Sequence, residues 1–254
     1  MRILLTVFLF ASLSGCAEST RGPVVFFLDG AGWYASGGAV ENGLRKAGYK
    51  GEYEVFTWSA FLGPAQDHFI TAQSKIVARR LAGKIERVRK NDPDGAIQVM
   101  GLSAGTAVIL SALEELPDGV QVDNVVLLSP SASAERDLTK IMQHVRRNLY
   151  ATCSPHDGIV AALAVNADGR PGPPAGEKGL RMPRKGDAQT QAAYARVINI
   201  PWQPSYVGFN WNGSHTGVTS DDFIAGVIAP RILSAEPFPL DRPVLERFAV
   251  GSER

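Results

Sequence analysis

The chain has few of the residues that mark a disulfide-rich scaffold or a protein that binds polyanions. Two cysteines in 254 residues cannot build a disulfide framework. Its 26 basic and 25 acidic residues give a net charge of +1, which excludes the strong positive field of a nucleic-acid-binding protein. The sequence also lacks clustered cysteine ligands, a phosphate-binding loop and the H-E-x-x-H motif. We therefore expect no metal, no organic cofactor and no nucleic-acid partner.

The N-terminal apolar run is shorter than a membrane span. It covers residues 3–13, whereas a transmembrane helix takes about 20 apolar residues. Arg2 before it and small residues after it are typical of a secretory signal peptide over residues 1–15. The sequence Leu-Ser-Gly-Cys that ends at Cys16 also resembles the lipobox of bacterial lipoproteins, whose cysteine thiol is acylated and becomes the new N-terminus. A plain signal peptide with an incidental cysteine is the alternative.

The lipobox predicts where the protein resides. Residues 16–22 would form the lipidated end and a short polar tether, so the lipid anchor is the expected contact with a membrane. Ala17, rather than Asp, follows the cysteine, which in Gram-negative lipoproteins resembles the pattern sorted to the outer membrane. We expect an exported cell-envelope lipoprotein that faces the periplasm in a Gram-negative cell. Acylation of Cys16 would leave Cys153 without an intrachain disulfide partner.

From Pro23 onward, strand-like and helix-like segments alternate. The expected strands cover residues 24–28, 54–58, 97–100, 125–128, 149–152 and 197–200, and the expected helices cover 39–47, 67–90, 106–116, 137–145 and 222–233. Strands separated by helices imply right-handed crossovers and a mostly parallel, doubly wound sheet of about six strands. We expect one α/β domain over residues 23–254, with no large cap domain.

One stretch departs from this alternation. Residues 166–187 are rich in Gly, Pro, Arg and Lys and are expected to form a long loop between the fifth and sixth strands. Loops of this length are often functional or mobile. A lid over a substrate and a disordered surface excursion are both compatible with the composition.

The most informative motif follows the third expected strand. Residues 101–105, Gly-Leu-Ser-Ala-Gly, fit the nucleophile elbow G-x-S-x-G. The glycines are needed because the serine occupies a strained turn, where larger side chains would collide with the neighbouring strand and helix. A β-branched strand precedes the motif and an amphipathic helix follows it. We predict that Ser103 is a nucleophile.

A serine hydroxyl needs a base, and the base needs a carboxylate to orient it. Asp157 lies just beyond the fifth expected strand, where the acid of a Ser-Asp-His order belongs, although Asp-Gly is also a turn signal. His215 follows a short polar loop after the sixth strand. His68 and His144 precede the acid in the chain, and His156 adjoins it. His215 is therefore the predicted base.

A tetrahedral oxyanion requires two hydrogen-bond donors. We expect one to be the backbone N–H of Ala104, directly after the nucleophile. The second should come from the turn after the first strand, where glycines let the backbone approach a substrate closely. Ala31 is the expected donor and Gly30 the alternative, while an ordinary strand-to-helix turn would explain both. Trp33 and Trp211 are expected to line an apolar acyl pocket, with core packing as the alternative.

Together these features resemble the α/β-hydrolase superfamily over essentially all of residues 23–235. The three residues of the predicted triad match the family in type and in order. The turn Asp29-Gly30 departs from the His-Gly of many members, and the usual N-terminal antiparallel strands are missing. The resemblance implies a small hydrolase, similar in plan to compact esterases and cutinase-like enzymes.

The resemblance also implies an activity. A serine carboxyl-ester hydrolase of this kind cleaves a small-molecule or lipid ester through an acyl-enzyme. An acyltransferase or a thioesterase uses the same triad, and a non-catalytic envelope lipoprotein could keep the fold as a binding module. A dinucleotide-binding protein is excluded, because residues 30–32, Gly-Ala-Gly, lack the third glycine of G-x-G-x-x-G.

Overall fold

The computed structural model describes most of the chain between Gly22 and Asp241. The described ranges are 22–31, 35–56, 67–162, 166–234, 238–239 and 241, with the side chains of 67–73 left out. Cys16 and Trp33 lie outside these ranges, as does the predicted signal peptide. Among the described helices, none combines the length and the apolar character that crossing a bilayer requires.

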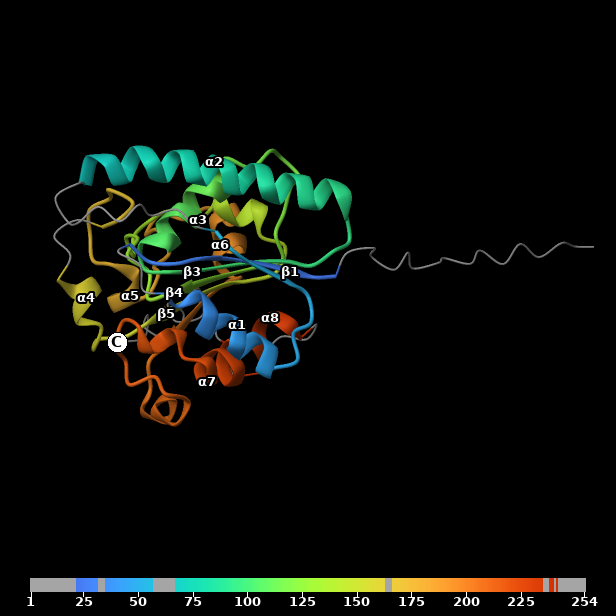
Figure 1. Ribbon diagram of the computed structural model, residues 1–254. Coiled ribbons are helices and arrows are strands. Elements are labelled where there is room, and N and C mark those ends of the chain that lie inside the picture. The colour runs from blue at the N-terminus through green and yellow to red at the C-terminus, as the bar shows by residue number, and fades with distance from the viewer. Residues whose placement is uncertain are drawn as a thin grey trace, which may run out of the picture.

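Within the described ranges, six strands form one all-parallel sheet in the order β2-β1-β3-β4-β5-β6 (Figure 1). The strands are β1 (Val24–Leu28), β2 (Glu52–Val55), β3 (Ile97–Leu102), β4 (Asn124–Leu128), β5 (Leu149–Cys153) and β6 (Val197–Pro201). The chain steps outward from β1 to β2, crosses back to β3 and then continues to the opposite edge, so the strand order reverses between β1 and β3. The predicted parallel, doubly wound sheet is confirmed, and no large cap interrupts the described part of the chain.

Helices cover both faces of the sheet (Figure 1). One face carries α2 (Asp67–Asn91), α3 (Ala104–Glu114) and α6 (Ala188–Tyr194), and the other carries α1 (Gly37–Lys46), α7 (Asp221–Phe223) and α8 (Ala229–Leu233). Short helices α4 (Gly158–Ala161) and α5 (Ala175–Lys178) follow β5. The described residues also form 3-10 turns at η1 (Ile141–His144), η2 (Pro204–Phe209) and η3 (Gly217–Thr219).

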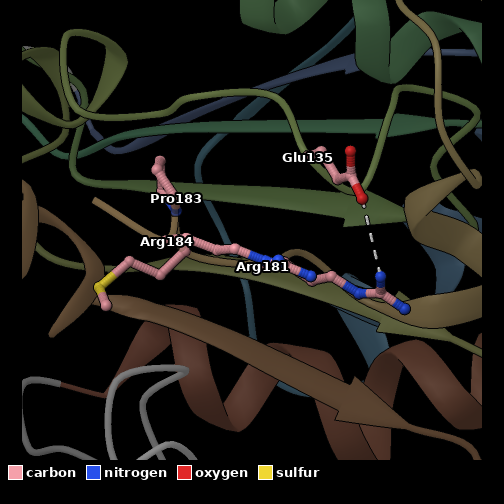
Figure 2. Close-up of a pocket in the computed structure, with 5 residues that line it drawn as sticks. Glu135, Arg181, Pro183 and Arg184 are labelled. Carbon is pink, nitrogen blue, oxygen red and sulfur yellow. Dashed lines mark ion pairs between the residues drawn. The ribbon is translucent and has the colours of Figure 1, made fainter. Parts of the chain in front are cut away.

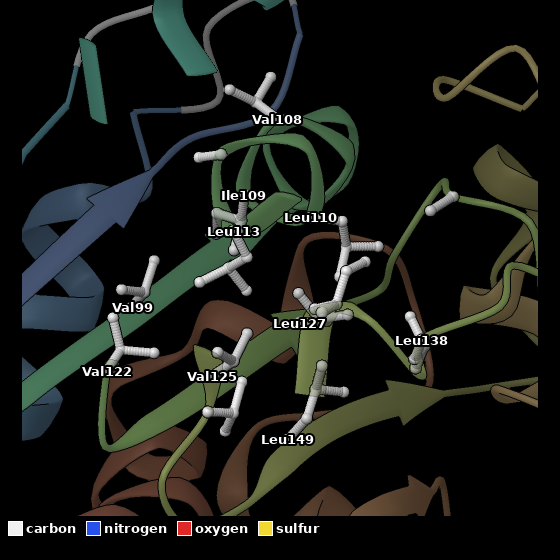
Figure 3. Packing of buried hydrophobic residues seen from close by; sticks show 14 of the residues in the cluster. Val99, Val108, Ile109, Leu110, Leu113, Val122, Val125, Leu127, Leu138 and Leu149 are labelled. Carbon is white, nitrogen blue, oxygen red and sulfur yellow. The ribbon is translucent and has the colours of Figure 1, made fainter. Parts of the chain in front are cut away.

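The two faces of the sheet explain the apolar sequences of its strands. Neighbouring strand residues point to opposite faces, so Phe26 of β1 joins the core under α2 and α3, whereas Phe27 joins the core under α1 and α7. Strands β1, β3, β4 and β5 are buried along their whole length, as expected of a parallel sheet covered on both sides. Figure 3 shows the first core, in which apolar side chains of α3 lie beside those of β3 and β4.

One predicted helix does not form. Residues 137–145 hold only the 3-10 turn η1 instead of an α-helix. The Asp137 carboxylate accepts hydrogen bonds from the backbone N–H and the hydroxyl of Thr139, which makes a local turn. Val145 has extended backbone and pairs with Val122 in an isolated bridge. Side-chain competition at one end and strand pairing at the other override the helical pattern.

The last predicted helix forms with an irregular middle. Residues 221–233 comprise α7, the π-helical segment η4 (Ile224–Ile228) and α8. Pro230 lies in the first turn of α8 and cannot donate the backbone hydrogen bond that a continuous α-helix needs. The wider π turn directly before it takes up this interruption, which is the usual setting of a single π segment.

The stretch 166–187 is folded against the segment that follows β4. The carboxylate of Asp168 accepts hydrogen bonds from the backbone N–H of Ser133 and lies 3.5 Å from the guanidinium of Arg136. Both charged side chains are only 2% exposed. The described loop is therefore packed on the domain and is not a disordered excursion; its role as a lid stays a prediction.

Candidate functional site

The predicted catalytic side chains follow three strands of one sheet. Ser103 follows β3, Asp157 lies after β5, and His215 lies in the segment after β6. Because all the strands are parallel, their carboxyl ends share one edge of the sheet. The strand order reverses between β1 and β3, and ligands of open α/β sheets bind outside such a reversal point. The turn after β1 and the Ser103 turn flank this point.

Ser103 forms a sharp turn between β3 and α3. Its backbone has φ 53° and ψ −123°, a conformation that costs a non-glycine residue about 1–3 kcal/mol. Its N–H donates a hydrogen bond of 2.9 Å to the carbonyl of Leu128, while the N–H and the hydroxyl of Thr106 donate to its carbonyl. The strained strand-to-helix turn that the motif requires is therefore present.

The two motif glycines lie where a side chain would not fit. A Cβ atom on Gly101 would lie 2.6 Å from Cδ1 of Ile109. A Cβ atom on Gly105 would lie 2.6 Å from the carbonyl oxygens of both Leu28 and Asp29. Non-bonded carbon atoms in favourable contact are about 3.5–4.0 Å apart. The absence of a side chain at Gly105 lets the first turn of α3 touch the backbone at the end of β1.

Asp157 and His215 form a buried pair. Nδ1 of His215 lies 3.0 Å and 2.9 Å from the two carboxylate oxygens of Asp157, and their side chains are 2% and 0% exposed. The N–H of Val160 also donates to Asp157, because this residue caps α4. A carboxylate at Nδ1 keeps the proton on that nitrogen and makes Nε2 the basic atom of the ring. The structure thus brings together the predicted acid and the predicted base.

The remaining histidines have other surroundings. Nδ1 of His144 lies 2.9 Å from the carbonyl of Val120. The ring of His156 packs edge-on against Trp202, with centroids 4.6 Å apart. The side chain of His68 lies outside the described residues. Neither described ring contacts a carboxylate in the way that His215 does.

Trp211 is packed in the core. Its side chain is 0% exposed and packs against Tyr206 and Phe223, at centroid distances of 5.7 and 4.6 Å. Its indole N–H donates a 3.0 Å hydrogen bond to the carbonyl of Ser214. This burial between η2 and α7 favours the alternative of core packing, and a place for Trp211 in an acyl pocket stays a prediction. Trp211 supports the loop that carries His215.

The turn after β1 contains two residues whose role the sequence did not reveal. Asp29 accepts a hydrogen bond from the N–H of Gly30, and it accepts two more from Ser36. An Asp before a glycine and a Ser before a helix are both common local signals, but nothing in the sequence pairs them across seven positions. Ala31 is half-buried against the core, and Ala104 begins α3.

Ser131 is a further residue that sequence reasoning missed. It follows β4, its N–H lies 3.5 Å from the carbonyl of Ser103, and its side chain is buried. Its position beside the nucleophile turn depends on how β4 ends, which a sequence motif does not encode. Ser129, two residues earlier, has φ 42° and donates its N–H to the hydroxyl of Thr152.

The described surface also has a cavity of about 630 Å³ lined by none of the predicted site residues. Its lining comprises Glu135, Arg181, Met182, Pro183 and Arg184 (Figure 2). Arg181 and Glu135 form an ion pair of 3.8 Å across it. In the part of the chain that the structure covers, no group of three or more His, Cys, Asp or Glu side chains could hold a metal ion.

Comparisons with known proteins find similar backbones but no family. No protein-family model matches the chain, and no curated protein matches it. A cutinase-like protein from Cryptococcus sp. is 11% identical, with a TM-score of 0.45, over 85% of this chain and 96% of that one. Est1E from Butyrivibrio proteoclasticus is 10% identical, with a TM-score of 0.45, over 86% and 92%.

A dienelactone hydrolase from Anabaena variabilis is 15% identical, with a TM-score of 0.43, over 83% of this chain and 85% of that one. These values are too low to carry an argument about chemistry. The activity has to be inferred from the residues of this chain.

Proposed function

We propose that the chain is a serine hydrolase of the α/β-hydrolase type that cleaves carboxylic esters. One observation carries the proposal: the buried Asp157–His215 pair follows β5 and β6 of the same parallel sheet in which β3 ends in the strained turn of Ser103. A buried carboxylate at Nδ1 of a histidine, together with a serine in an elbow turn, has the chemistry of a Ser-His-Asp triad.

The reaction begins with proton transfer from the hydroxyl of Ser103 to Nε2 of His215. The serine oxygen attacks the ester carbonyl and forms a tetrahedral oxyanion, while Asp157 stabilises the imidazolium. The backbone N–H groups of Ala104 and Ala31 donate hydrogen bonds to that oxyanion. His215 then gives the proton to the departing alcohol, which leaves an acyl group on the serine.

The second half of the cycle uses water as the nucleophile. His215 removes a proton from water, the hydroxide oxygen attacks the acyl carbonyl, and collapse of the second tetrahedral species releases the acid and restores the Ser103 hydroxyl. An acyltransferase differs only in the acceptor that replaces water, and a thioesterase differs only in the leaving sulfur. Both remain alternatives with the same residues.

Ester hydrolysis and active-site labelling test the proposal together. Residues 16–254 are supplied with p-nitrophenyl esters of graded chain length, and a fluorophosphonate probe is added separately. We expect turnover and a single covalent adduct on Ser103, and we expect Ser103→Ala to lose both. A mature, folded protein with no adduct would instead indicate a non-catalytic envelope protein that keeps the fold.

We also propose that the protein is exported and acylated at Cys16, on the sequence Leu-Ser-Gly-Cys alone. Metabolic labelling with an alkyne-bearing fatty acid should mark the wild-type chain and leave Cys16→Ser unlabelled. Label on both chains, or on neither, would contradict acylation at this cysteine.

A further inference from the structure

The carboxylate of Asp29, directly after β1, accepts hydrogen bonds from Gly30 and from Ser36, directly before α1. Oδ1 of Asp29 accepts hydrogen bonds from the N–H of Gly30 at 2.9 Å and from the hydroxyl of Ser36 at 2.5 Å. Its Oδ2 accepts a hydrogen bond of 2.8 Å from the N–H of Ser36. Ser36 is buried and is the N-cap residue of α1. A single carboxylate therefore joins the carboxyl end of β1 to the start of the next helix.

The same turn lies against the helix that carries the proposed first oxyanion donor. The carbonyl oxygens of Leu28 and Asp29 are so close to Gly105 that a Cβ atom there would lie 2.6 Å from each. Gly105 is the residue after Ala104 in the first turn of α3. The backbone that leaves β1 thus passes beside Ala104, which is where a second donor to one oxyanion has to lie.

The hydrogen bonds also distinguish between Gly30 and Ala31, the two candidates for the second oxyanion donor. The N–H of Gly30 is engaged by the carboxylate of Asp29, so this amide is directed at its own neighbour rather than at a substrate. Ala31 is the next residue along the turn and is half-buried against the core. The structure therefore favours the N–H of Ala31 as the second oxyanion donor.

We infer that Asp29 is a positioning residue for the oxyanion hole: its carboxylate fixes Gly30 and Ser36 so that the amide of Ala31 is presented beside that of Ala104. This inference rests on the proposed hydrolase function. A donor fixed before the reaction stabilises the transition state without reorganisation, and displacement of such groups by about 1 Å can cost about 100-fold in rate.

Kinetics of Asp29→Ala and Asp29→Asn test the inference, with p-nitrophenyl butyrate as substrate and a trifluoromethyl ketone as a mimic of the tetrahedral intermediate. We expect Asp29→Ala to lower kcat about 10- to 100-fold, with KM within about threefold of the wild-type value. The inhibition constant of the ketone should rise in step with the fall in kcat/KM. A residue that only stabilised the fold would not couple these two quantities.

Asp137→Ala is the matched control, because the Asp137 carboxylate likewise accepts hydrogen bonds from the backbone N–H and the hydroxyl of one residue, Thr139, at 2.9 and 2.6 Å, but lies in the segment that leads to η1. We expect its kcat, KM and ketone affinity to match those of the wild type. Loss of kcat in this control equal to that of Asp29→Ala would overturn the inference.

Ser36→Ala extends the test if Asp29→Ala does not fold, because it removes one of the three hydrogen bonds and leaves the carboxylate in place. The expected order of kcat is wild type, Ser36→Ala, then Asp29→Asn, with KM unchanged. Equal kcat values in folded variants would overturn the role of Asp29 while leaving the proposed hydrolase intact. Failure of the proposed function has a different signature: wild-type protein without Ser103-dependent turnover or a fluorophosphonate adduct.

Discussion

The backbone at Ser103 is held in a conformation that the serine would not adopt alone. Its positive φ is enforced by hydrogen bonds to Leu128 and Thr106 and by the close packing of Gly101 and Gly105. The strain is therefore offset by the surrounding strand and helix, as expected of a site that exposes a nucleophile. Removing the Cβ atom should release part of it.

Ser103→Gly should consequently be more stable than Ser103→Ala, although neither variant keeps the hydroxyl. We expect a difference of about 1 kcal/mol in the free energy of unfolding, because glycine tolerates positive φ, less its greater freedom in the unfolded chain. Urea denaturation of both variants measures this difference. Equal stability, or a more stable alanine variant, would contradict strain at this position.

Individual residues also show which parts of the site could be predicted from the sequence. The chemistry of Ser103 is encoded locally, because the two glycines and the flanking strand and helix lie within one short segment. The pairing of Asp157 with His215 could be expected from the sequence, because each residue follows an expected strand in the order Ser, Asp, His. By contrast, Asp29 depends on a contact with Ser36 across a turn, and Trp211 depends on two helices that close over it. Neither contact leaves a local pattern in the sequence.

At the scale of elements, the contact between β1 and α3 sets the geometry of the site. Gly105→Ala should disrupt it, because the added methyl group meets two backbone carbonyls that cannot rotate away. We expect the free energy of unfolding to fall by about 1–3 kcal/mol, the usual cost of overpacking, and ester hydrolysis to be lost. Urea denaturation and a p-nitrophenyl ester assay measure the two effects.

Gly83→Ala is the control for this substitution, since it makes the same chemical change in α2. There an added Cβ atom would lie 3.9 Å from a guanidinium nitrogen of Arg87, the flexible end of a side chain. Alanine is the better helix former, so this variant should gain about 0.5–1 kcal/mol and keep full activity. If both variants lost stability equally, the close approach at Gly105 would not explain its effect.

The elements also differ in how far their sequence determined them. The buried strands were evident as apolar runs, and β1 and the start of α2 occur at the predicted residues. The prediction of a helix over 137–145 was wrong. The apolar spacing there is helical, but the Asp137 side chain accepts the N–H of Thr139, and Val145 pairs with Val122 in an isolated bridge. Helix α6 was not predicted, although Asp187 caps it through Thr190, because it adjoins a glycine- and proline-rich stretch.

For the whole molecule, buried phenol groups should limit stability at alkaline pH. Burial raises the pKa of five tyrosines above the ordinary value of about 10: Tyr49, Tyr53, Tyr150, Tyr194 and Tyr206. Above that pH the unfolded chain loses these protons while the folded chain keeps them. The folded state then binds more protons, so stability falls as pH rises.

The urea midpoint should therefore decrease from about pH 9 to about pH 11, together with the appearance of tyrosinate absorbance. Tyr53→Phe is the informative variant. The phenol of Tyr53 donates a hydrogen bond to the carbonyl of Gly37, and burial strongly raises its pKa. Its stability should decline less steeply over this range than that of the wild type. Parallel curves for the two proteins would contradict the assignment to this tyrosine.

The direction of β1 has a consequence for orientation at a membrane. Pro23 precedes β1 at the amino edge of the sheet, whereas Ser103 lies at the carboxyl edge, so the length of a five-residue strand, about 16 Å, separates the two ends. With the proposed anchor at Cys16, the chain enters the domain at the edge of the sheet opposite the proposed site. A tether of residues 16–22 that kept this amino edge towards the bilayer would present the proposed site to the aqueous compartment, so water-borne esters would reach it more readily than lipids of the anchoring membrane.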